Sequence, residues 1–233
     1  MKKFGLIIFI SALVFGVIFA NVFDLGTYGL NMPISVFKSK THGSGNITTQ
    51  KREIGDFEKI EISGGFDVEI VLQSEKNLEI TGDDNLLSLV RAEVNDGVLE
   101  IERKERYSSK KGIKIKIANP SLKELDISGA SVARIANINE KDFKLDLSGA
   151  SKVFPDGSVE NFVIDSSGAS IVDAFQLKAF NTNIDASGAS KLSVNSSEKL
   201  AVDVSGATRV YYKGNPGEIL KKTSGASSLK AIR

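Results

Sequence analysis

The sequence predicts an all-β fold, a parallel β-helix built as a solenoid of about 19–20-residue coils that follows an N-terminal hydrophobic helix. A motif close to Asp-X-Ser-Gly-Ala-Ser recurs through the second half of the chain. Its glycines are Gly129, Gly149, Gly168, Gly188, Gly206 and Gly225. Successive glycines lie 20, 19, 20, 18 and 19 residues apart. A period near twenty is typical of solenoids, in which each coil buries its apolar face against its neighbours.

Apolar residues lie at even distances from each motif glycine. Four residues before it stand Leu125, Leu145, Ile164, Ile184 and Val202, and four after it stand Ala133, Val153, Val172, Leu192, Val210 and Leu229. Even spacing is the alternation of a β-strand and differs from the 3.6-residue period of a helix. The small Ser-Gly-Ala centre suits a bend between strands. A leucine-rich repeat, the rival solenoid, lacks its Leu/Asn spacing here.

Stacked coils place equivalent residues above one another at about 4.8 Å, so each motif position forms a lane along the solenoid. Leu147 belongs to an interior apolar lane, whereas Lys152 points outward. The serines that precede the glycines form an outward hydroxyl lane: Ser128, Ser148, Ser167, Ser187, Ser205 and Ser224. Their hydroxyls can both donate and accept hydrogen bonds.

The N-terminal residues 1–23 form a signal-anchor or a signal peptide. Lys2 and Lys3 precede an uncharged stretch from Phe4 to Phe23, long enough as a helix to span about 30 Å of hydrocarbon. The positive-inside rule places the chain after this stretch outside the cytoplasm. The long apolar core and the poor cleavage site at Ile18–Ala20 favour an uncleaved anchor, and a cleaved signal peptide remains the alternative.

Residues 24–44 are predicted to be a linker because Gly, Ser, Thr and Pro are frequent and no period persists. The lone His42 is expected to be solvated there. Residues 45–233 are predicted to form the β-helix domain. Residues 45–119 are its less regular β-rich part, and residues 120–233 are the repeated coils.

The less regular part contains two further signals. Ile60–Gly65 is a degenerate first copy of the motif. Val90–Val94 and Val98–Ile101 flank Asn95-Asp96-Gly97, a tight-turn sequence. We therefore expect an antiparallel hairpin at the capped end of the solenoid, since an open end exposes strand edges and core.

Three segments carry a resemblance to a known family. They are Ser44–Gln73, Gly82–Ile101 and Asn119–Leu125, and together they resemble the GIN domain family of auto-transporter adhesin head domains. The resemblance covers about Gly45 to Arg233. It implies a β-helical, exported domain of bacterial type, and it brings no catalytic residues with it.

Composition excludes several classes of protein. The chain has 30 Lys+Arg against 29 Asp+Glu, a formal net charge of +1, so no nucleic-acid partner is expected. Cysteine is absent and His42 is the only histidine, which removes disulfides, thiolate chemistry and histidine metal clusters. We predict that the protein is not an enzyme, with no catalytic, cofactor-binding or metal-ligating residue.

An outward aspartate lane is the sharpest chemical feature: Asp126, Asp146, Asp165, Asp185 and Asp203. Neighbouring charges at this spacing repel by about 0.8 kcal/mol in water, so something must offset the repulsion. The favoured interpretation is hydrogen bonding to backbone N–H groups or serine hydroxyls at the bend. A bound Ca²⁺ is the alternative. Catalytic carboxylates are disfavoured because a uniform lane does not supply two differently tuned acids.

Two further features have a structural and a functional interpretation. Arg103–Lys111 is the densest basic run, expected to be a solvated loop joining two strands, with contact to anionic wall polymer or lipid headgroups as the alternative. Tyr211 and Tyr212 are expected to pack at an edge, with ligand contact by an exposed aromatic pair as the alternative.

The sequence therefore predicts an exported, membrane-tethered, non-enzymatic domain of the cell envelope that serves surface binding or adhesion. Its expected partners are an envelope polymer, a glycan or a protein, and residues 4–23 contact the membrane. Two alternatives stay open. One is an envelope structural or regulatory domain that binds a partner protein. The other is a polysaccharide-acting enzyme, which would need a cleft that short, uniform repeats do not build.

Overall fold

The computed structural model describes residues 40–232. The signal-anchor or signal peptide expected over residues 1–23, and the linker as far as residue 39, lie outside these residues. In the described part of the chain, no helix has the length and apolar character needed to cross a membrane.

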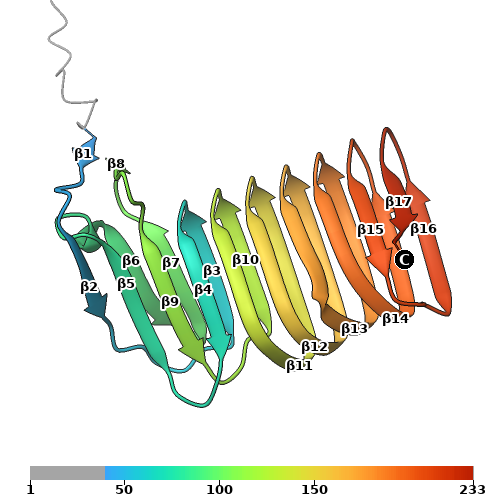
Figure 1. Ribbon diagram of the computed structural model, residues 1–233, viewed down its shortest axis with the longest axis horizontal. Helices are drawn as coiled ribbons and strands as arrows, with labels where there is room; N and C mark the ends of the chain where they lie inside the picture. The colour runs from blue at the N-terminus through green and yellow to red at the C-terminus, as the bar shows by residue number, and fades with distance from the viewer. Residues whose placement is uncertain (1–39, 233) are drawn as a thin grey trace, which may run out of the picture. The chain divides into compact units, whose positions relative to one another are not determined.

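The described chain is built almost entirely of β-strands (Figure 1). In chain order they are β1 (Thr41–His42), β2 (Ile47–Lys51), β3 (Lys59–Gly64), β4 (Asp67–Leu72), β5 (Asn77–Asp83), β6 (Val90–Asn95), β7 (Val98–Arg103), β8 (Tyr107–Ser108), β9 (Lys114–Asn119), β10 (Glu124–Gly129), β11 (Val132–Gly149), β12 (Lys152–Gly168), β13 (Ile171–Gly188), β14 (Lys191–Val204), β15 (Arg209–Lys213), β16 (Glu218–Thr223) and β17 (Ser228–Ala231). One short 3-10 helix, η2 (Leu87–Leu89), lies between β5 and β6.

The strands from β10 to β17 form a parallel β-solenoid, as predicted. Each coil enters along a strand that ends at a motif glycine and leaves along a second strand after the bend. Equivalent positions of successive coils pair in parallel register, for example Asp146 with Asp165 and Gly149 with Gly168. The coils therefore stack side by side toward the β16/β17 end in Figure 1.

The motif glycines are required by the way the coils stack. All six have φ between +67° and +130°, a region that L side chains rarely adopt. A Cβ added at Gly168 would fall within 3.0 Å of the backbone of Gly149 in the preceding coil. The next residue uses this close approach, because Ala169 N–H donates to Gly149 O at 2.7 Å.

The last residue of each motif forms a second hydroxyl lane, which the sequence analysis did not assign. In the first five of the six motifs these residues are at most 2% exposed: Ser131, Ser151, Ser170, Ser190 and Thr208. Ser227 of the sixth motif is partly exposed. Ser151 Oγ donates to Gly129 O at 3.3 Å, and Ser190 Oγ accepts from Ser170 N–H at 3.2 Å. The hydroxyls of Ser131 and Ser190 thereby give buried N–H groups of Phe66 and Ser170 an acceptor, whereas the Ser170 and Thr208 hydroxyls have no hydrogen-bond partner among the described residues.

The core follows the predicted even-numbered lanes. Leu125, Leu145, Ile164, Ile184 and Val202 are at most 3% exposed. The rings of Phe143 and Phe162 stack with centroids 5.8 Å apart. Leu147 is fully buried and Lys152 is exposed, which confirms the assignment of inward and outward positions.

The less regular part adds coils in an order that differs from the chain order. β3 pairs with β10 so that Gly64 lies beside Gly129, which confirms the degenerate first motif. The coil of β7 and β9 is then placed outside the coil of β3 and β4, because β7 pairs with β3 and β9 with β4. After β9 the chain crosses back at Asn119 to the other side of the β3/β4 coil, where β10 pairs with β3. The buried Asn119 Nδ2 donates to Phe57 O at 2.9 Å.

Antiparallel strands close this end of the solenoid. β6 and β7 form the predicted hairpin, with Asp96 and Gly97 at φ of 48° and 77° in its turn. In the same coil, β5 pairs antiparallel with β9, and β2 pairs antiparallel with β5. The reversal of direction ends the parallel stack and covers its terminal coil.

Candidate binding surfaces

The strands that end at the motif glycines carry an unbroken row of carboxylates, here called the acidic ladder. In parallel register its members are Glu100, Glu61, Asp126, Asp146, Asp165, Asp185 and Asp203. The ladder contains the predicted aspartate lane and extends it by two glutamates of the irregular coils. Lys222 follows Asp203 at the far end, with its Nζ 3.5 Å from Asp203 Oδ2.

The predicted hydrogen bonding of these aspartates at the bend is wrong. Within residues 40–232, none of the five aspartates of the lane accepts a hydrogen bond from a backbone N–H or a serine hydroxyl at the bends. The bend N–H groups are already used between coils, as in Ala150 N–H to Gly129 O at 2.8 Å. The aspartates also stand on the strand, three residues before the glycine.

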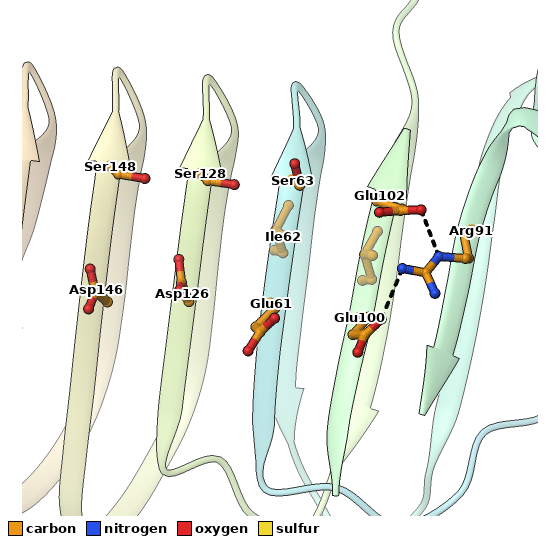
Figure 2. A pocket seen from close by; sticks show the side chains of 11 residues that line it. Glu61, Ile62, Ser63, Arg91, Glu100, Glu102, Asp126, Ser128, Asp146 and Ser148 are labelled. Atoms are coloured by element: carbon orange, nitrogen blue, oxygen red, sulfur yellow. Dashed lines mark hydrogen bonds and ion pairs between the residues drawn. The ribbon is translucent and has the colours of Figure 1, made fainter. Parts of the chain in front are cut away.

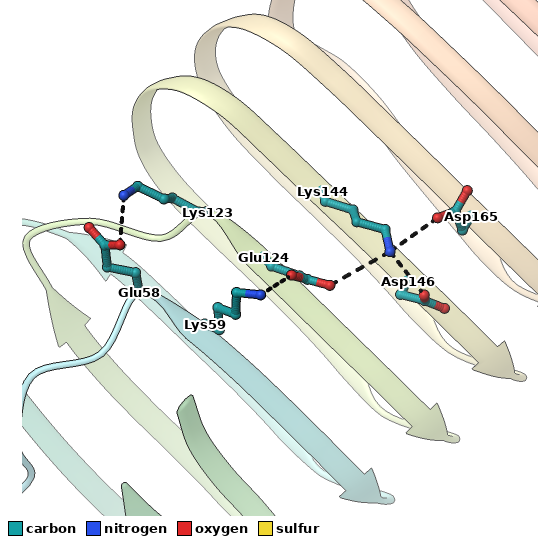
Figure 3. A network of polar contacts seen from close by, with 7 residues as sticks. All are labelled: Glu58, Lys59, Lys123, Glu124, Lys144, Asp146 and Asp165. Atoms are coloured by element: carbon teal, nitrogen blue, oxygen red, sulfur yellow. Dashed lines mark hydrogen bonds and ion pairs between the residues drawn. The ribbon is translucent and has the colours of Figure 1, made fainter. Parts of the chain in front are cut away.

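Lysine provides the counter-charge instead, as Figure 3 shows. Lys144 Nζ lies 3.2 Å from Asp165 Oδ2, 3.3 Å from Asp146 Oδ2 and 3.6 Å from Glu124 Oε1. Its hydrogen bond to Asp165 is the main reason that the pKa of Lys144 is raised. Lys59 Nζ reaches Glu124 Oε2 at 2.8 Å, and this hydrogen bond lowers the pKa of Glu124.

Among residues 40–232, Asp126 is a ladder carboxylate that has no Lys or Arg within ion-pair distance. Partial burial raises the pKa of Asp126, and the neighbouring charges of Asp146 and Glu61 raise it further. Figure 2 shows these side chains side by side on adjacent strands, lining a shallow hollow of about 220 Å³. At its far edge Arg91 binds Glu102 at 2.7 Å and Glu100 at 2.9 Å, which neutralises that end of the ladder.

The strands that follow the bends form the opposite outward surface, and it carries mostly cations. We call it the basic–aromatic face and define it by Lys152, Phe154, Phe175, Lys178, Lys191, Arg209, Tyr211, Lys213 and Lys230. Lys152, Ile171, Lys191 and Arg209 form one register row across the coils. The exposed anions on these strand segments are Asp156, Glu160 and Asp173.

The cations of this face differ from those beside the acidic ladder. In the described part of the chain, none of its six Lys and Arg side chains has a carboxylate within ion-pair distance, taken as 4.0 Å. Two of them lie over aromatic rings: Lys191 Nζ is 5.6 Å from the Tyr211 centroid and Lys213 Nζ is 5.4 Å from the Phe175 centroid. Cation–π contact holds a lysine head in place without neutralising its charge.

Tyr211 and Tyr212 point to opposite sides of their strand. Tyr212 packs against the core, where it pairs with the buried Val194. Tyr211 points outward and pairs with Ser193. The expectation of edge packing is therefore confirmed for Tyr212, whereas Tyr211 belongs to the basic–aromatic face.

The basic run Arg103–Lys111 joins β7 to β9, as predicted. Its middle is anchored, because Tyr107 packs against the core and Arg103 lies over its ring at 5.7 Å. Burial raises the pKa of Tyr107. The short strand β8 in this run pairs with β1, which begins at Thr41.

His42 is exposed on β1, in a segment assigned to the linker that here contacts the domain. The buried Asp83 carboxylate holds this corner together, accepting from Gly45 N–H at 2.7 Å and from Ser109 Oγ at 2.5 Å. These hydrogen bonds, Ser109 first, lower the pKa of Asp83. Among residues 40–232, no three acidic or histidine side chains group closely enough to hold a metal ion.

This parallel β-solenoid fold is also found in solved structures of bacterial proteins. A "putative adhesin" from Bacteroides fragilis superposes with a TM-score of 0.67 at 20% identity, covering 82% of this chain and 99% of that one. A "putative lipid binding protein" from Parabacteroides distasonis gives 0.53 at 20% identity, covering 84% of this chain and 100% of that one. A "putative adhesin" from Parabacteroides merdae gives 0.51 at 19% identity, covering 83% and 99%.

Residues 56–216, well over half of the chain, match the family described as "Putative auto-transporter adhesin, head GIN domain". The chain belongs to this family, as its resemblance indicated. Among curated proteins, no match to the chain was found. The structural likenesses are all at low identity and show the fold alone.

Proposed function

We propose that the protein is an exported, membrane-tethered, non-enzymatic domain of the cell envelope that binds an extended partner along its repeated outward faces. The observation that carries the proposal is the register of outward side chains, which repeat from coil to coil along the whole stack. A rigid surface with one equivalent contact every coil suits a partner that is itself extended and repetitive.

Three further facts support this proposal. The family description and two of the similar structures carry the word adhesin. The hollow beside Asp126 is shallow and open and lies on one regular face of the stack, without a long loop that would close it over a substrate. Tethering is supported by the sequence of residues 4–23, which matches the length of a membrane-spanning helix.

The test is binding of the fluorescently labelled full chain to isolated cell envelopes and to a glycan array, with the array glycans analysed for cleavage afterwards. The proposal expects saturable binding to envelopes or to a class of glycan, with every glycan recovered intact. Shortened glycans would show an enzyme, and binding to neither target would overturn the proposal.

A further inference from the structure

The cations of the basic–aromatic face lack compensating carboxylates within residues 40–232. Six cations lie on β12, β13, β14, β15 and β17, and none of them has a carboxylate at ion-pair distance in the described structure. On the acidic face, by contrast, Lys59, Lys144 and Lys222 are all ion-paired. Lys191 and Arg209 lie one coil apart, and unpaired like charges at this spacing repel, so the face favours an anionic partner.

The arrangement of the cations defines the shape of that partner. Lys152, Lys191 and Arg209 occupy one register row that runs across the strands, along the stacking direction of the coils. From β12 to β17 the face covers four strand spacings, about 19 Å. From β12 to β17 this row carries a cation on three of five coils, with Ile171 and Ser228 on the other two, so a linear chain lying along it meets three cations, whereas a compact anion meets only one or two.

The aromatic rings act as supports for the cations. Because Lys191 lies over Tyr211 and Lys213 over Phe175, these ammonium groups are held before any ligand arrives. Positioning a charge in advance lowers the entropy lost on binding. The same contacts cover the ring faces, so this surface offers few open platforms on which nucleic-acid bases could stack.

The neutral side chains between the cations indicate a hydroxyl-rich partner and argue against a lipid surface. Ser158, Gln176 and Asn195 lie between or beside the charged positions and can hydrogen-bond to hydroxyl groups. The exposed large apolar side chains of the described chain are scattered, and only Phe154, at 36% exposure, belongs to this face. A membrane-inserting surface would present them as one patch.

We infer that the basic–aromatic face binds an extended acidic polysaccharide along the solenoid axis, its carboxylates pairing with the row of Lys152, Lys191 and Arg209. This inference rests on the proposed function and assigns the face and the partner class to it. The acidic ladder on the opposite side repels the same polymer, so binding is confined to one face.

The test compares two triple variants of the full chain that lose the same charge. Lys152→Gln, Lys191→Gln and Lys230→Gln remove cations of the basic–aromatic face. Lys59→Gln, Lys123→Gln and Lys222→Gln, the matched control, remove three lysines elsewhere on the surface. Binding to polygalacturonate is measured by calorimetry at low salt, and circular dichroism checks that both variants remain folded. Should the first triple variant unfold, the single variant Lys152→Gln replaces it.

The inference predicts binding of polygalacturonate by the wild type and no binding of neutral dextran. The face variant should bind about tenfold more weakly, since each exposed ion pair contributes modestly, and the control should bind as the wild type does. Equal weakening in both triple variants would overturn the inference. So would tighter binding to phosphatidylglycerol vesicles or to oligothymidylate that depends on the same lysines.

The two levels of the proposal can fail separately. If the full chain binds cell envelopes and the face variant binds them equally well, the assigned face and partner class are wrong while the proposed function stands. If neither envelopes nor any glycan is bound, the proposed function itself fails.

Discussion

Replacing Gly168 with alanine tests the stacking of the coils directly. The added Cβ would meet the backbone of Gly149 in the preceding coil, 2.9 Å from its nitrogen and closer still to its carbonyl oxygen. In addition, Gly168 has φ of +127°, which an L residue adopts only with strain. The substitution therefore combines a backbone cost with a steric clash.

The expected loss of stability follows from these two contributions. A residue held in a sparsely populated backbone region costs about 1–3 kcal/mol, and overpacking against atoms that cannot move aside costs about 1–3 kcal/mol more. The neighbouring atoms here are backbone, fixed by the Ala169–Gly149 hydrogen bond at 2.7 Å. Gly168→Ala should therefore lower the free energy of unfolding by about 4 kcal/mol.

Gly97→Ala is the matched control, because the sequence change is identical. Gly97 also has a positive φ, +77°, but a Cβ there would meet nothing within 4 Å. It should cost only about 1 kcal/mol for its backbone conformation. Urea denaturation of the full chain, followed by far-ultraviolet circular dichroism, measures both losses. If Gly97→Ala costs as much as Gly168→Ala, close stacking of the bends is not what requires glycine.

The other predictions concern the core and the acidic ladder. Leu147→Asp buries a charge in a fully enclosed lane and should destabilise by at least about 3 kcal/mol more than Lys152→Asp; similar melting temperatures would contradict the lane assignment. The raised pKa of Asp126 means that its ionised form is disfavoured in the folded state, which lowers the free energy of unfolding. This loss of stability is complete at a pH above the pKa of Asp126 in the folded protein, and it is absent at a pH below the pKa of Asp126 in the unfolded chain. Asp126→Asn should therefore stabilise at pH 7, by about 1 kcal/mol, and the gain should disappear in melts at acidic pH; a gain that persists there would refute the electrostatic cause. Millimolar calcium should leave the wild-type melt unchanged, because Lys144 already pairs with Asp146 and Asp165; a saturable rise that Asp165→Asn abolishes would instead reveal a metal site.

The regular coils could be predicted because each position of the repeat faces one environment. Leu147 and Lys152 stand on opposite sides of the chain, and alternation alone separates them. The hairpin of β6 and β7 could also be predicted, because Asp96 and Gly97 form a local turn. Such features depend on residues close in sequence or exactly one repeat apart.

Other features depend on contacts that no local pattern encodes. The placement of β7 and β9 outside β3 and β4 is fixed by pairing between distant segments and by the return of the chain at Asn119. The sequence did not predict the ion pairs of Lys144. The equivalent positions of the next two coils are Val163 and Asn183, so lysine does not repeat at this position of the coil.

The basic–aromatic face left a weak signal in the sequence. Lys152, Lys191 and Arg209 each stand three residues after a motif glycine, but Ile171 and Ser228 interrupt the series. Phe175 lies in a bulge where β13 loses register with both neighbouring strands, so its contact with Lys213 at 5.4 Å follows only from the folded chain.

The measurement that tests the account most directly is a lysine footprint of the wild-type full chain. Lysines are acetylated with and without saturating polygalacturonate, and the rate of each is read by mass spectrometry. The account predicts protection confined to Lys152, Lys178, Lys191, Lys213 and Lys230, with unchanged rates at Lys59, Lys144 and Lys222. Uniform protection, or protection on the acidic face, would contradict the claim that one face of this solenoid binds an extended polyanion.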